Sequence, residues 1–554
     1  MKKNIGGDEM LHGNKKLGRD RVIKIIRETI PLIFILVSAI IVIFHNIGGS
    51  LADWDESIYA EVSKEILIYR DWITLHWNYS LWFHKPPLYM WLTAIMYKLV
   101  GVNEFSARFW SAIFGIGGIV ITYFLGKELY NKYVGLISSL ILLSTPQYQN
   151  FSRMGMLDVP ITFFIALSIL LFWSGLKNSK YFILSGISVG FAIMTKGVVG
   201  LLPFFIVLLF LVLTNLSPLK NKNMLKGLIA SIAVAAPWHI SQLTLQGKKF
   251  FDNYFMYHVI KRSEQAIEGH VGTDFYYFDI LKKGFYPYSL FILFAVLYNA
   301  KTAFEEKKKE DILILSWIVV VLGVFILAES KLPWYIIPIY PALSISVAQF
   351  FYKFIENRDG LVFSGVFIAI ALWISHLSIV KYPPIIKHSP INSMLVIGTV
   401  ICIILFLVDK MIRHQKLFNN VIIKKSIPML LVGLILISTI HLPHVLDYNP
   451  NTKAVVQNMK IVSTPNDTLY LYTISTPAPL FYSDRKVSGI NDENRLKQIF
   501  NDTKTVFVLI KTDDVANIGV NYKIISKAGN IMLITNNIRT PTTYTYIDSL
   551  SLHG

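Results

Sequence analysis

Thirteen uncharged apolar stretches dominate this sequence and limit the chain to one broad class of fold. Most of them approach the roughly 20 residues that a helix needs to cross the hydrocarbon core of a bilayer. Hydrophobic residues make up 53% of the 554 residues and charged residues only 16%, whereas an average soluble protein carries about 25% charged residues. We therefore predict a mainly α, polytopic transmembrane protein. The stretches are 30–48, 109–126, 134–149, 159–176, 181–195, 197–216, 227–247, 284–300, 312–328, 332–352, 361–380, 391–408 and 426–446.

Two of these stretches are divided only by Lys196. Together they exceed the length of one crossing, so we interpret them as two spans rather than one broken helix. The first stretch, 30–48, follows a basic and polar segment and lacks a clear small-x-small cleavage site. We interpret it as an uncleaved signal anchor with a cytoplasmic segment, 1–29, before it.

The distribution of the basic residues along the chain indicates membrane topology rather than nucleic-acid binding. Lys and Arg number 53 against 35 Asp and Glu, a net charge of +18, and such an excess often indicates nucleic acid. With the N-terminus in the cytoplasm, 26 of the basic residues fall in short inner segments, as the positive-inside rule requires. We therefore expect no nucleic-acid partner. The inner segments are 1–29, 127–133, 177–180, 217–226, 301–311, 353–360 and 409–425.

An odd number of spans places the C-terminus on the outer face. The tail 447–554 changes character, because short β-prone runs appear between polar turns. These runs are Thr468 to Ile474, Thr505 to Ile510 and Ile531 to Ile534. We predict a membrane domain over 30–446, with long outer loops at 49–108 and 248–283, followed by a small extracytoplasmic α/β domain. The single cysteine, Cys402, excludes an intramolecular disulfide and a Cys metal cluster.

Ionisable residues gather in the predicted outer loops and are almost missing from the spans. A carrier or pump would place such groups near the membrane midplane. Acidic residues at one interface can orient an acceptor or remove its proton, and Lys and Arg can hold a phosphate and stabilise it as a leaving group. Apolar walls below can hold a polyprenyl tail. This combination suits the transfer of a sugar from a lipid phosphate to an acceptor.

Each candidate also has an interpretation without catalysis. The Asp55-Glu56 pair can cap a re-entrant helix, and Asp158 can be the N-cap of a span. Lys85, before Pro86 and Pro87, can be a snorkelling interfacial lysine. Trp334 and Tyr335 fit an aromatic belt at the membrane interface.

Several strings in the sequence carry a resemblance to a known family. They resemble the bacterial lipid-carrier-dependent glycosyltransferases of the GT-C class, relatives of the protein O-mannosyltransferases, and among these the aminoarabinose transferases of lipid A. The resemblance covers roughly residues 30–350. The strings are Asp55-Glu56-x-x-Tyr59-Ala60-Glu61, Asp71-Trp72, Lys85-Pro86-Pro87-Leu88-Tyr89-x-Trp91, Glu104-Phe105-x-x-Arg108, Arg153-x-x-x-x-Asp158-x-Pro160, Thr195-Lys196-Gly197, Pro237-Trp238 and Lys331-x-Pro333-x-Tyr335-x-x-Pro338-x-Tyr340-Pro341.

The resemblance implies a GT-C-like fold and a polyprenyl-phosphate-sugar donor, used on the periplasmic side of the bacterial inner membrane. It implies that Asp55 is the key acid, that Asp158 is the second acid and that basic residues face the donor phosphate. The candidate site is completed from the same strings and loops. It comprises Asp55, Asp158 and Glu56 as catalytic residues, Lys85, Arg262 and Lys331 at the donor phosphate, and Tyr59, Tyr335 and Trp334 as the cavity lining.

This sequence departs from the aminoarabinose transferases at two places. Those enzymes usually carry Arg where Ile58 stands, and Glu where His84 stands. A histidine there can be a metal ligand, so a divalent ion around His84, His258 and His270 is one hypothesis. His258 and Arg262 have the i,i+4 spacing of neighbours on one helix face.

The leading hypothesis is an inverting glycosyltransferase that uses a lipid-phosphate sugar. Lipid A or another envelope glycolipid is the first candidate for the acceptor, and a protein serine or threonine, as in the O-mannosyltransferases, is the second. A lipid or sugar transporter without transfer chemistry is the alternative from another class. A transporter should show ionisable groups at the midplane or repeated halves, and this sequence has neither.

Overall fold

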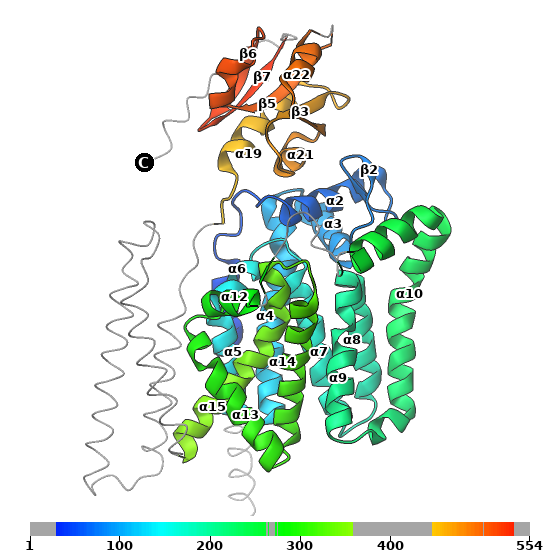
Figure 1. Ribbon diagram of the computed structural model, residues 1–554, viewed down its shortest axis with the longest axis vertical. Coiled ribbons are helices and arrows are strands. Elements are labelled where there is room, and N and C mark those ends of the chain that lie inside the picture. The colour runs from blue at the N-terminus through cyan, green and yellow to red at the C-terminus, as the bar shows by residue number, and fades with distance from the viewer. Residues whose placement is uncertain are drawn as a thin grey trace, which may run out of the picture.

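The computed structural model of the chain describes residues 29–261, 264, 272, 273, 275–357, 446–501 and 504–536. Long helices stand side by side in one bundle, and a small sheet lies above one end of it (Figure 1). The predicted spans 361–380, 391–408 and 426–446, except residue 446, lie outside the described residues, as does the predicted segment 1–29 except its last residue.

Within the described ranges, six helical segments are long and apolar enough to cross a membrane. Polytopic organisation is thereby confirmed for this part of the chain. Shorter apolar helices accompany them at Thr29–Phe44, Leu88–Val100 and Lys132–Ser144. The bundle contains α4 (Glu104–Leu129), α5 (Lys132–Ser144), α6 (Pro146–Ser152), α7 (Asp158–Gly175), α8 (Tyr181–Lys196), α9 (Leu202–Leu213), α10 (Lys222–Phe250), α13 (Ile292–Glu305), α14 (Lys309–Leu327) and α15 (Tyr340–Asn357).

Helices α8 and α9 form an antiparallel hairpin, as the two-span interpretation requires. The ring of Phe172 on α7 lies 5.8 Å from Phe182, near the start of α8, and 5.8 Å from Phe210, near the end of α9. A straight helix would separate those two residues by roughly 42 Å. The chain reverses at Gly197, whose φ of 61° suits glycine. Lys196 therefore lies at the tip of the hairpin.

Helices α8 and α10 pack closely through two glycines. A Cβ atom on Gly186 would lie only 1.9 Å from the carbonyl oxygen of Gly227, and one on Gly227 would lie 2.4 Å from that of Phe182. Small residues allow the two backbones to approach closely. The van der Waals packing that results is a main source of attraction between helices in lipid.

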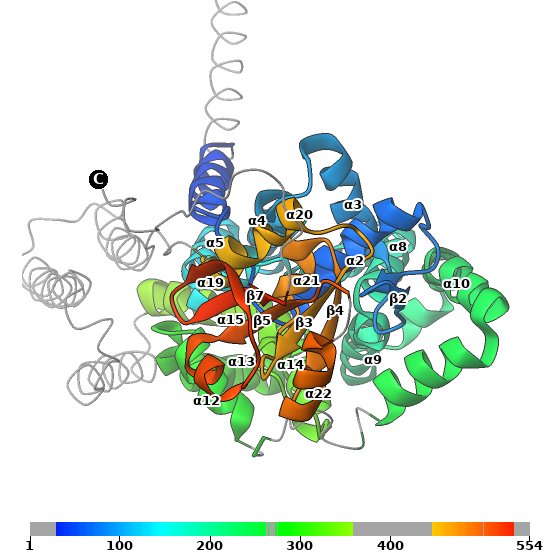
Figure 2. The same cartoon turned by 90° about the horizontal axis from the view of Figure 1, so that it is seen from above.

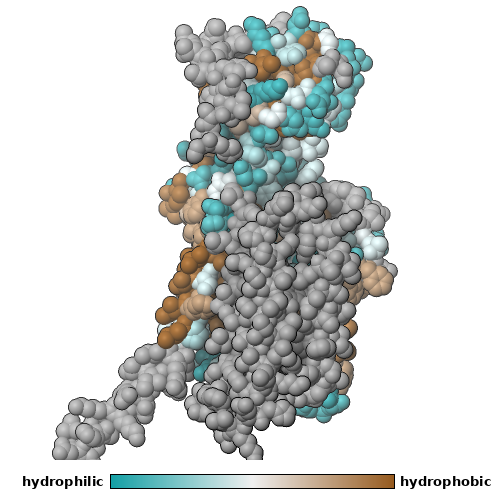
Figure 3. Space-filling model, turned by 90° about the vertical axis from the view of Figure 1, so that its left-hand side faces the viewer, coloured by the Kyte–Doolittle hydropathy of each residue, from teal (hydrophilic) through white to brown (hydrophobic). Residues whose placement is uncertain are grey.

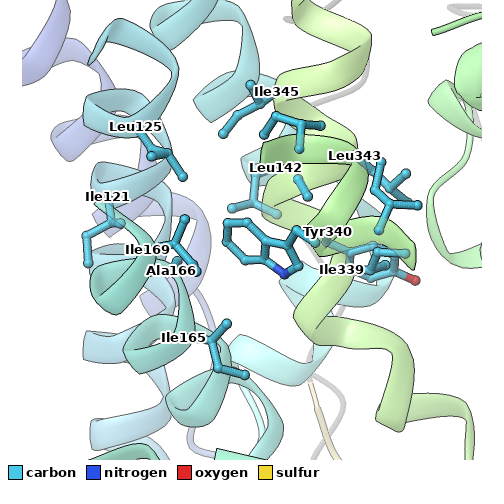
Figure 4. Packing of buried hydrophobic residues seen from close by; sticks show 14 of the residues in the cluster. Ile121, Leu125, Leu142, Ile165, Ala166, Ile169, Ile339, Tyr340, Leu343 and Ile345 are labelled. Atoms are coloured by element: carbon cyan, nitrogen blue, oxygen red, sulfur yellow. The ribbon is translucent and has the colours of Figure 1, made fainter. Parts of the chain in front are cut away.

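The core of the bundle joins α4, α5, α7 and α15. Trp317 on α14 is fully buried there, and its indole N–H donates to the carbonyl oxygen of Pro338 at 3.0 Å. Aliphatic side chains from separate helices belong to the same cluster, and Figure 4 shows Leu125, Leu142 and Ile169 among them. Such close packing fixes the ends of these helices relative to one another.

The predicted outer loop 49–108 is folded into short elements. It contains α2 (Asp55–Tyr69), the two-stranded pair β1 (His76–Trp77) and β2 (Ser80–Leu81), and α3 (Leu88–Val100). Helix α3 starts directly after Pro87, which suits a helix start, so Lys85 stands in the loop before it. The second long loop begins with a π-helical segment, Phe251–Lys261, and contains α12 (Tyr276–Gly284).

The tail forms a five-stranded sheet in the order β4-β3-β5-β7-β6. Strands β3, β4 and β5 run parallel, whereas β7 is antiparallel to β5 and β6. The three predicted β-prone runs correspond to β3, β5 and β7. The elements are α19 (Pro450–Gln457), α20 (Met459–Val462), β3 (Thr468–Tyr472), α21 (Ala478–Ser483), β4 (Lys486–Ile490), α22 (Glu493–Phe500), β5 (Phe507–Lys511), β6 (Lys523–Ala528) and β7 (Ile531–Thr535).

In the view from above, the tail lies over the bundle, with α21 next to α2 of the first outer loop (Figure 2). Leu51, Ala60 and Tyr97 share one apolar cluster with Val455, Phe481 and other residues of the tail. The Tyr482 hydroxyl accepts a hydrogen bond from the backbone N–H of Leu51 at 2.8 Å. The tail is thus packed onto the outer loop and is not tethered by its linker alone.

A buried charged cluster joins α2 to the tail. The Lys64 ammonium lies 2.5 Å from Glu61 and 2.8 Å from Asp484, and Lys460 lies 2.5 Å from the second oxygen of Asp484. Beside it, both oxygens of Glu65 accept the backbone N–H of Tyr79 at 3.1 Å. Burial, followed by the charge of Glu61, raises the pKa of Glu65 to about 8.

The surface of the bundle differs in polarity from the surface of the tail. In the side view, apolar residues cover the visible flank of the described bundle, while hydrophilic residues cover much of the tail above it (Figure 3). Apolar side chains exposed on long helices are expected where lipid surrounds the protein.

We expect Lys64→Met to loosen the tail from α2. The change leaves the buried Glu61 carboxylate without its cation, and breaking a buried pair costs about 3–5 kcal/mol. Limited proteolysis in detergent should then cleave more readily near residues 446–449. Lys497→Met removes an exposed i,i+4 pair with Glu493 and should change little. Equal resistance of both variants would contradict the role of the cluster.

We expect the thermal stability to decrease between about pH 4.5 and about pH 8, partly through Glu65. Its pKa is higher in the folded chain than in the unfolded chain, so folding takes up a proton over the interval from about 4.5 to about 8. Stability is therefore lost as the pH rises through that interval. Glu65→Gln should flatten the melting-temperature profile measured in detergent. An unchanged profile would exclude Glu65 as a source of the pH dependence.

Candidate active site

The candidate site is built on a buried ion pair between α2 and α4. Arg108 is fully buried, and its guanidinium donates to the two oxygens of Glu56, from Nε at 2.7 Å and from Nη2 at 3.0 Å. Remaining N–H groups of Arg108 donate to backbone carbonyls of the chain around the pair. Bidentate pairs of this kind are strong and directional. The pair fixes the start of α2 in position.

Glu56 has further partners that define its role. Its Oε2 accepts the N–H of Ala52 at 2.6 Å, and its Oε1 accepts the N–H of Gly155 at 2.7 Å. Both oxygens are therefore engaged, and the residue is only 1% exposed. These contacts anchor Glu56 between the loops, and its predicted place in the catalytic group stays a prediction.

Asp55 stands beside this anchor but in a different environment. It is the first residue of α2 and is half-buried. The N-cap of α2 is Trp54, which makes no side-chain capping bond. The α2 helix therefore lacks the side-chain cap that the non-catalytic interpretation of Asp55 and Glu56 assumed.

Asp158 is paired with Lys196 at the tip of the α8–α9 hairpin. The Lys196 ammonium donates to Oδ1 of Asp158, and both side chains are buried. The same ammonium lies 4.9 Å from the centre of the Tyr335 ring, which is a cation–π distance. The N-cap of α7 is Leu157, without a capping bond, so the interpretation of Asp158 as an N-cap is wrong.

The structure brings Asp55, Lys85, Asp158 and Lys196 into one electrostatic neighbourhood. The charges of Lys196, Asp55 and Lys85 all act on the Asp158 carboxyl group. These residues come from the start of α2, the loop before α3, the start of α7 and the end of α8. Four parts of the chain that are remote in the sequence thus meet at the end of the bundle that lies below the tail (Figure 1).

The remaining aromatic and basic candidates within the described residues make contacts of their own. Lys331 is buried, and its ammonium donates to the carbonyl oxygen of Ala328 at 3.1 Å. Trp334 packs on Phe151 with ring centres 5.8 Å apart, and its buried indole N–H has no hydrogen-bond partner among the described residues. Tyr59 is buried against Trp82 at 6.3 Å.

His84 and His258 are brought together, although 174 positions separate them. Their ring centres lie 3.9 Å apart, and His84 also stacks on Trp82 at 5.0 Å. His270 and Arg262 lie outside the described residues. The described residues contain no group of three or more His, Cys, Asp or Glu side chains suited to a metal ion, and two imidazoles supply half of the four ligands of a typical zinc site. His258 stands in the π-helical segment that ends at Lys261, and its predicted i,i+4 neighbour Arg262 is not among the described residues.

Lys196 is a residue of the group around Asp158 that the sequence analysis did not include in the site. It was visible there only as the residue dividing two spans and as part of Thr195-Lys196-Gly197. A lysine between two apolar stretches needs a partner or water. Asp158, at the start of another predicted span, is an acid that the predicted topology allows as this partner. That combination was the available signal.

Comparison with known proteins finds sequences that are similar to part of this chain. A family model described as dolichyl-phosphate-mannose-protein mannosyltransferase matches residues 84–240. An uncharacterized protein of Aquifex aeolicus is 30% identical over 57% of this chain and 63% of its own length. An undecaprenyl phosphate-alpha-4-amino-4-deoxy-L-arabinose arabinosyl transferase of Wigglesworthia glossinidia brevipalpis is 31% identical over 57% of this chain and 58% of its own. The chain thus matches these relatives over somewhat more than half of their length.

Solved structures decide the fold. ArnT from Cupriavidus metallidurans, solved with bound undecaprenyl phosphate, has a TM-score of 0.72 at 18% identity, and the match covers 93% of this chain and 98% of that one. The chain has a GT-C fold. The archaeal oligosaccharyltransferase AglB from Archaeoglobus fulgidus, solved with dolichol-phosphate and an inhibitory peptide, matches with a TM-score of 0.51 at 12% identity over 88% of this chain and 69% of that one. The resemblance noted in the sequence is confirmed at the level of this GT-C fold.

We expect Glu56→Gln to unfold the GT-C bundle more easily. The change leaves the buried charge of Arg108 without its counter-ion, at a cost of about 3–5 kcal/mol, so the melting temperature in detergent should fall. Glu128→Gln, which removes an exposed ion pair with Lys177, is the matched control and should cost less than about 1 kcal/mol. A Glu56→Gln protein with normal melting and no activity would instead make Glu56 catalytic.

Proposed function

We propose that this chain is a membrane glycosyltransferase that moves a sugar from a polyprenyl-phosphate donor to an envelope acceptor on the outer face of the membrane. The observation that carries the proposal is the convergence of Asp55, Lys85 and Lys196 on Asp158. The ammonium groups at this end of the bundle match the charged phosphate of such a donor. The apolar helices match its hydrocarbon tail.

The donor phosphate is assigned to the basic residues. In the reaction, the bond between the sugar anomeric carbon and the phosphate oxygen breaks, and the phosphate leaves with the bonding electrons. Lys85, Lys331 and Arg262 stabilise this charge, and Lys196 adds a fourth cation. The structures of ArnT with undecaprenyl phosphate and AglB with dolichol-phosphate support a lipid phosphate in this fold.

The acceptor is assigned to the acidic side. Asp55 accepts the proton of an acceptor hydroxyl as the acceptor oxygen bonds to the anomeric carbon from the opposite face, which inverts the configuration. A phosphate acceptor has already lost that proton, and Asp55 then orients it. Asp158 holds Lys196 in place and is the second acid of the site. Tyr59, Tyr335 and Trp334 shape the cavity around the reacting groups.

Lipid A is the acceptor that the similarity to the aminoarabinose transferases favours, with an aminoarabinose-like sugar on the donor. The second candidate is a protein hydroxyl, because the matching family model describes protein mannosyltransferases. Under both candidates the enzyme is a multi-pass protein of the bacterial inner membrane, with a cytoplasmic N-terminus and a periplasmic tail. A divalent ion at His84 and His258 has no part in this mechanism.

Mass spectrometry of envelope lipids and glycoproteins, from cells with and without this protein, tests the proposal directly. We expect one lipid A species to lose the mass of its added sugar when the protein is absent. Loss of the sugar from a glycoprotein would support the second candidate. Identical lipids and glycoproteins in the two strains, under conditions in which the protein is expressed, would contradict both.

We expect Asp55→Asn to abolish transfer, with at least a hundredfold loss of rate, while expression and membrane insertion stay normal. The substitution removes a base but preserves the size of a half-buried side chain. Asp252→Asn, at an exposed acid of the second long loop that pairs with Lys248, should retain activity. Full activity of Asp55→Asn, measured as sugar added to lipid A, would exclude Asp55 as the base or the orienting carboxylate of the reaction.

A further inference from the structure

Trp54 has a backbone conformation that normally belongs to glycine. Its φ of 63° and ψ of −121° match the first central position of a type II′ turn, where glycine is dominant. A bulky side chain at positive φ is a real outlier and marks strain that the surrounding structure must hold. The sequence thus places an indole at a position where glycine would be easier to accommodate.

The neighbours of Trp54 hold this conformation from both sides. Asp53 before it bonds to the Thr476 hydroxyl of the tail. Ala52 donates its N–H to Glu56 at 2.6 Å and accepts the Ser57 hydroxyl at 2.5 Å. The turn is therefore fixed by the anchor at Glu56 and by the tail together, so the indole has a defined direction.

The indole itself is 59% exposed, although large aromatic side chains usually gain stability through burial. The residue directly before Asp55 thus combines a strained backbone with an exposed ring. Strain retained at such a place is typical of residues that act on a ligand. An exposed indole presents a flat apolar face, which fits the C–H face of a sugar ring.

We propose that Trp54 is a stacking platform for the sugar ring of the acceptor headgroup, and so a specificity-determining residue of the reaction. The inference rests on the proposed glycosyltransferase function. We assign the acceptor rather than the donor for two reasons. The basic residues assigned to the donor phosphate stand on other elements, and the acceptor must approach Asp55, which follows Trp54 in the chain.

The experiment measures donor and acceptor dependence separately in Trp54→Gly. The probes are lipid A in detergent micelles and undecaprenyl phosphate-aminoarabinose, with binding of lipid A to the protein measured independently of transfer. We expect the KM for lipid A to rise roughly tenfold, the KM for the donor to stay unchanged and the melting temperature to stay equal or rise, because glycine adopts this backbone without strain. Trp54→Phe, which retains an aromatic ring, should recover part of the affinity.

Arg70→Gly is the matched control, because Arg70 also has positive φ, at the other end of α2, and should leave both KM values unchanged. A lower melting temperature of Trp54→Gly with an unchanged KM for lipid A would overturn the proposal and make Trp54 structural. A shift in the donor KM alone would also overturn it. If the wild-type protein binds lipid A but transfers no sugar, the proposed function is contradicted. In that case, weaker binding of lipid A by Trp54→Gly than by the wild type would still support the stacking platform. Absence of lipid A binding to the wild type would overturn the inference.

Discussion

The rest of the structure depends on the buried guanidinium of Arg108. Besides its two bonds to Glu56, it donates to the carbonyl oxygens of Ile47, Gly49, Ser50 and Leu446. Removing such a charge from water costs several kcal/mol, so the arrangement is stable only when the carboxylate and the carbonyls all surround it. One side chain thereby joins the end of the first span, the start of α2 and the beginning of the tail. The position of Asp55 follows from this junction.

Two buried ion pairs in this molecule, Glu56–Arg108 and Asp158–Lys196, have different surroundings. The difference indicates a structural role for the first pair and suits the proposed substrate-binding role of the second. Glu56 and Arg108 satisfy each other and gain backbone partners on both sides, which suits a permanent joint. Lys196 has one carboxylate and the face of an aromatic ring. An ammonium group with so few fixed partners retains donors for another anion. Under the proposed function, the second pair is therefore the one assigned to the anionic substrate.

The apolar stretches were enough to predict a polytopic helical fold and to place the reactive residues at one interface. The same sequence could not distinguish Asp55 from Glu56, because adjacent acids have the same chemistry. Successive residues on a helix point about 100° apart, so one of the two meets Arg108 and the other does not. The pairing of Asp158 with Lys196 needed the reversal at Gly197. Strands β4 and β6 were missed because they lie at the edges of the sheet and carry polar residues, as edge strands commonly do.

The way in which the tail is attached also has a consequence for the order of assembly. The backbone N–H of Ser50 donates to Asp447 at 2.8 Å, although 397 positions of the sequence separate the two residues. Glu104 likewise forms an ion pair with Lys453 at 2.6 Å. The first outer loop emerges early in synthesis, yet its partners arrive only after the whole described bundle has been made. Contacts of such long range form late and slowly. A chain still being synthesised thus has its long apolar helices before the loop above them has the contacts with the tail.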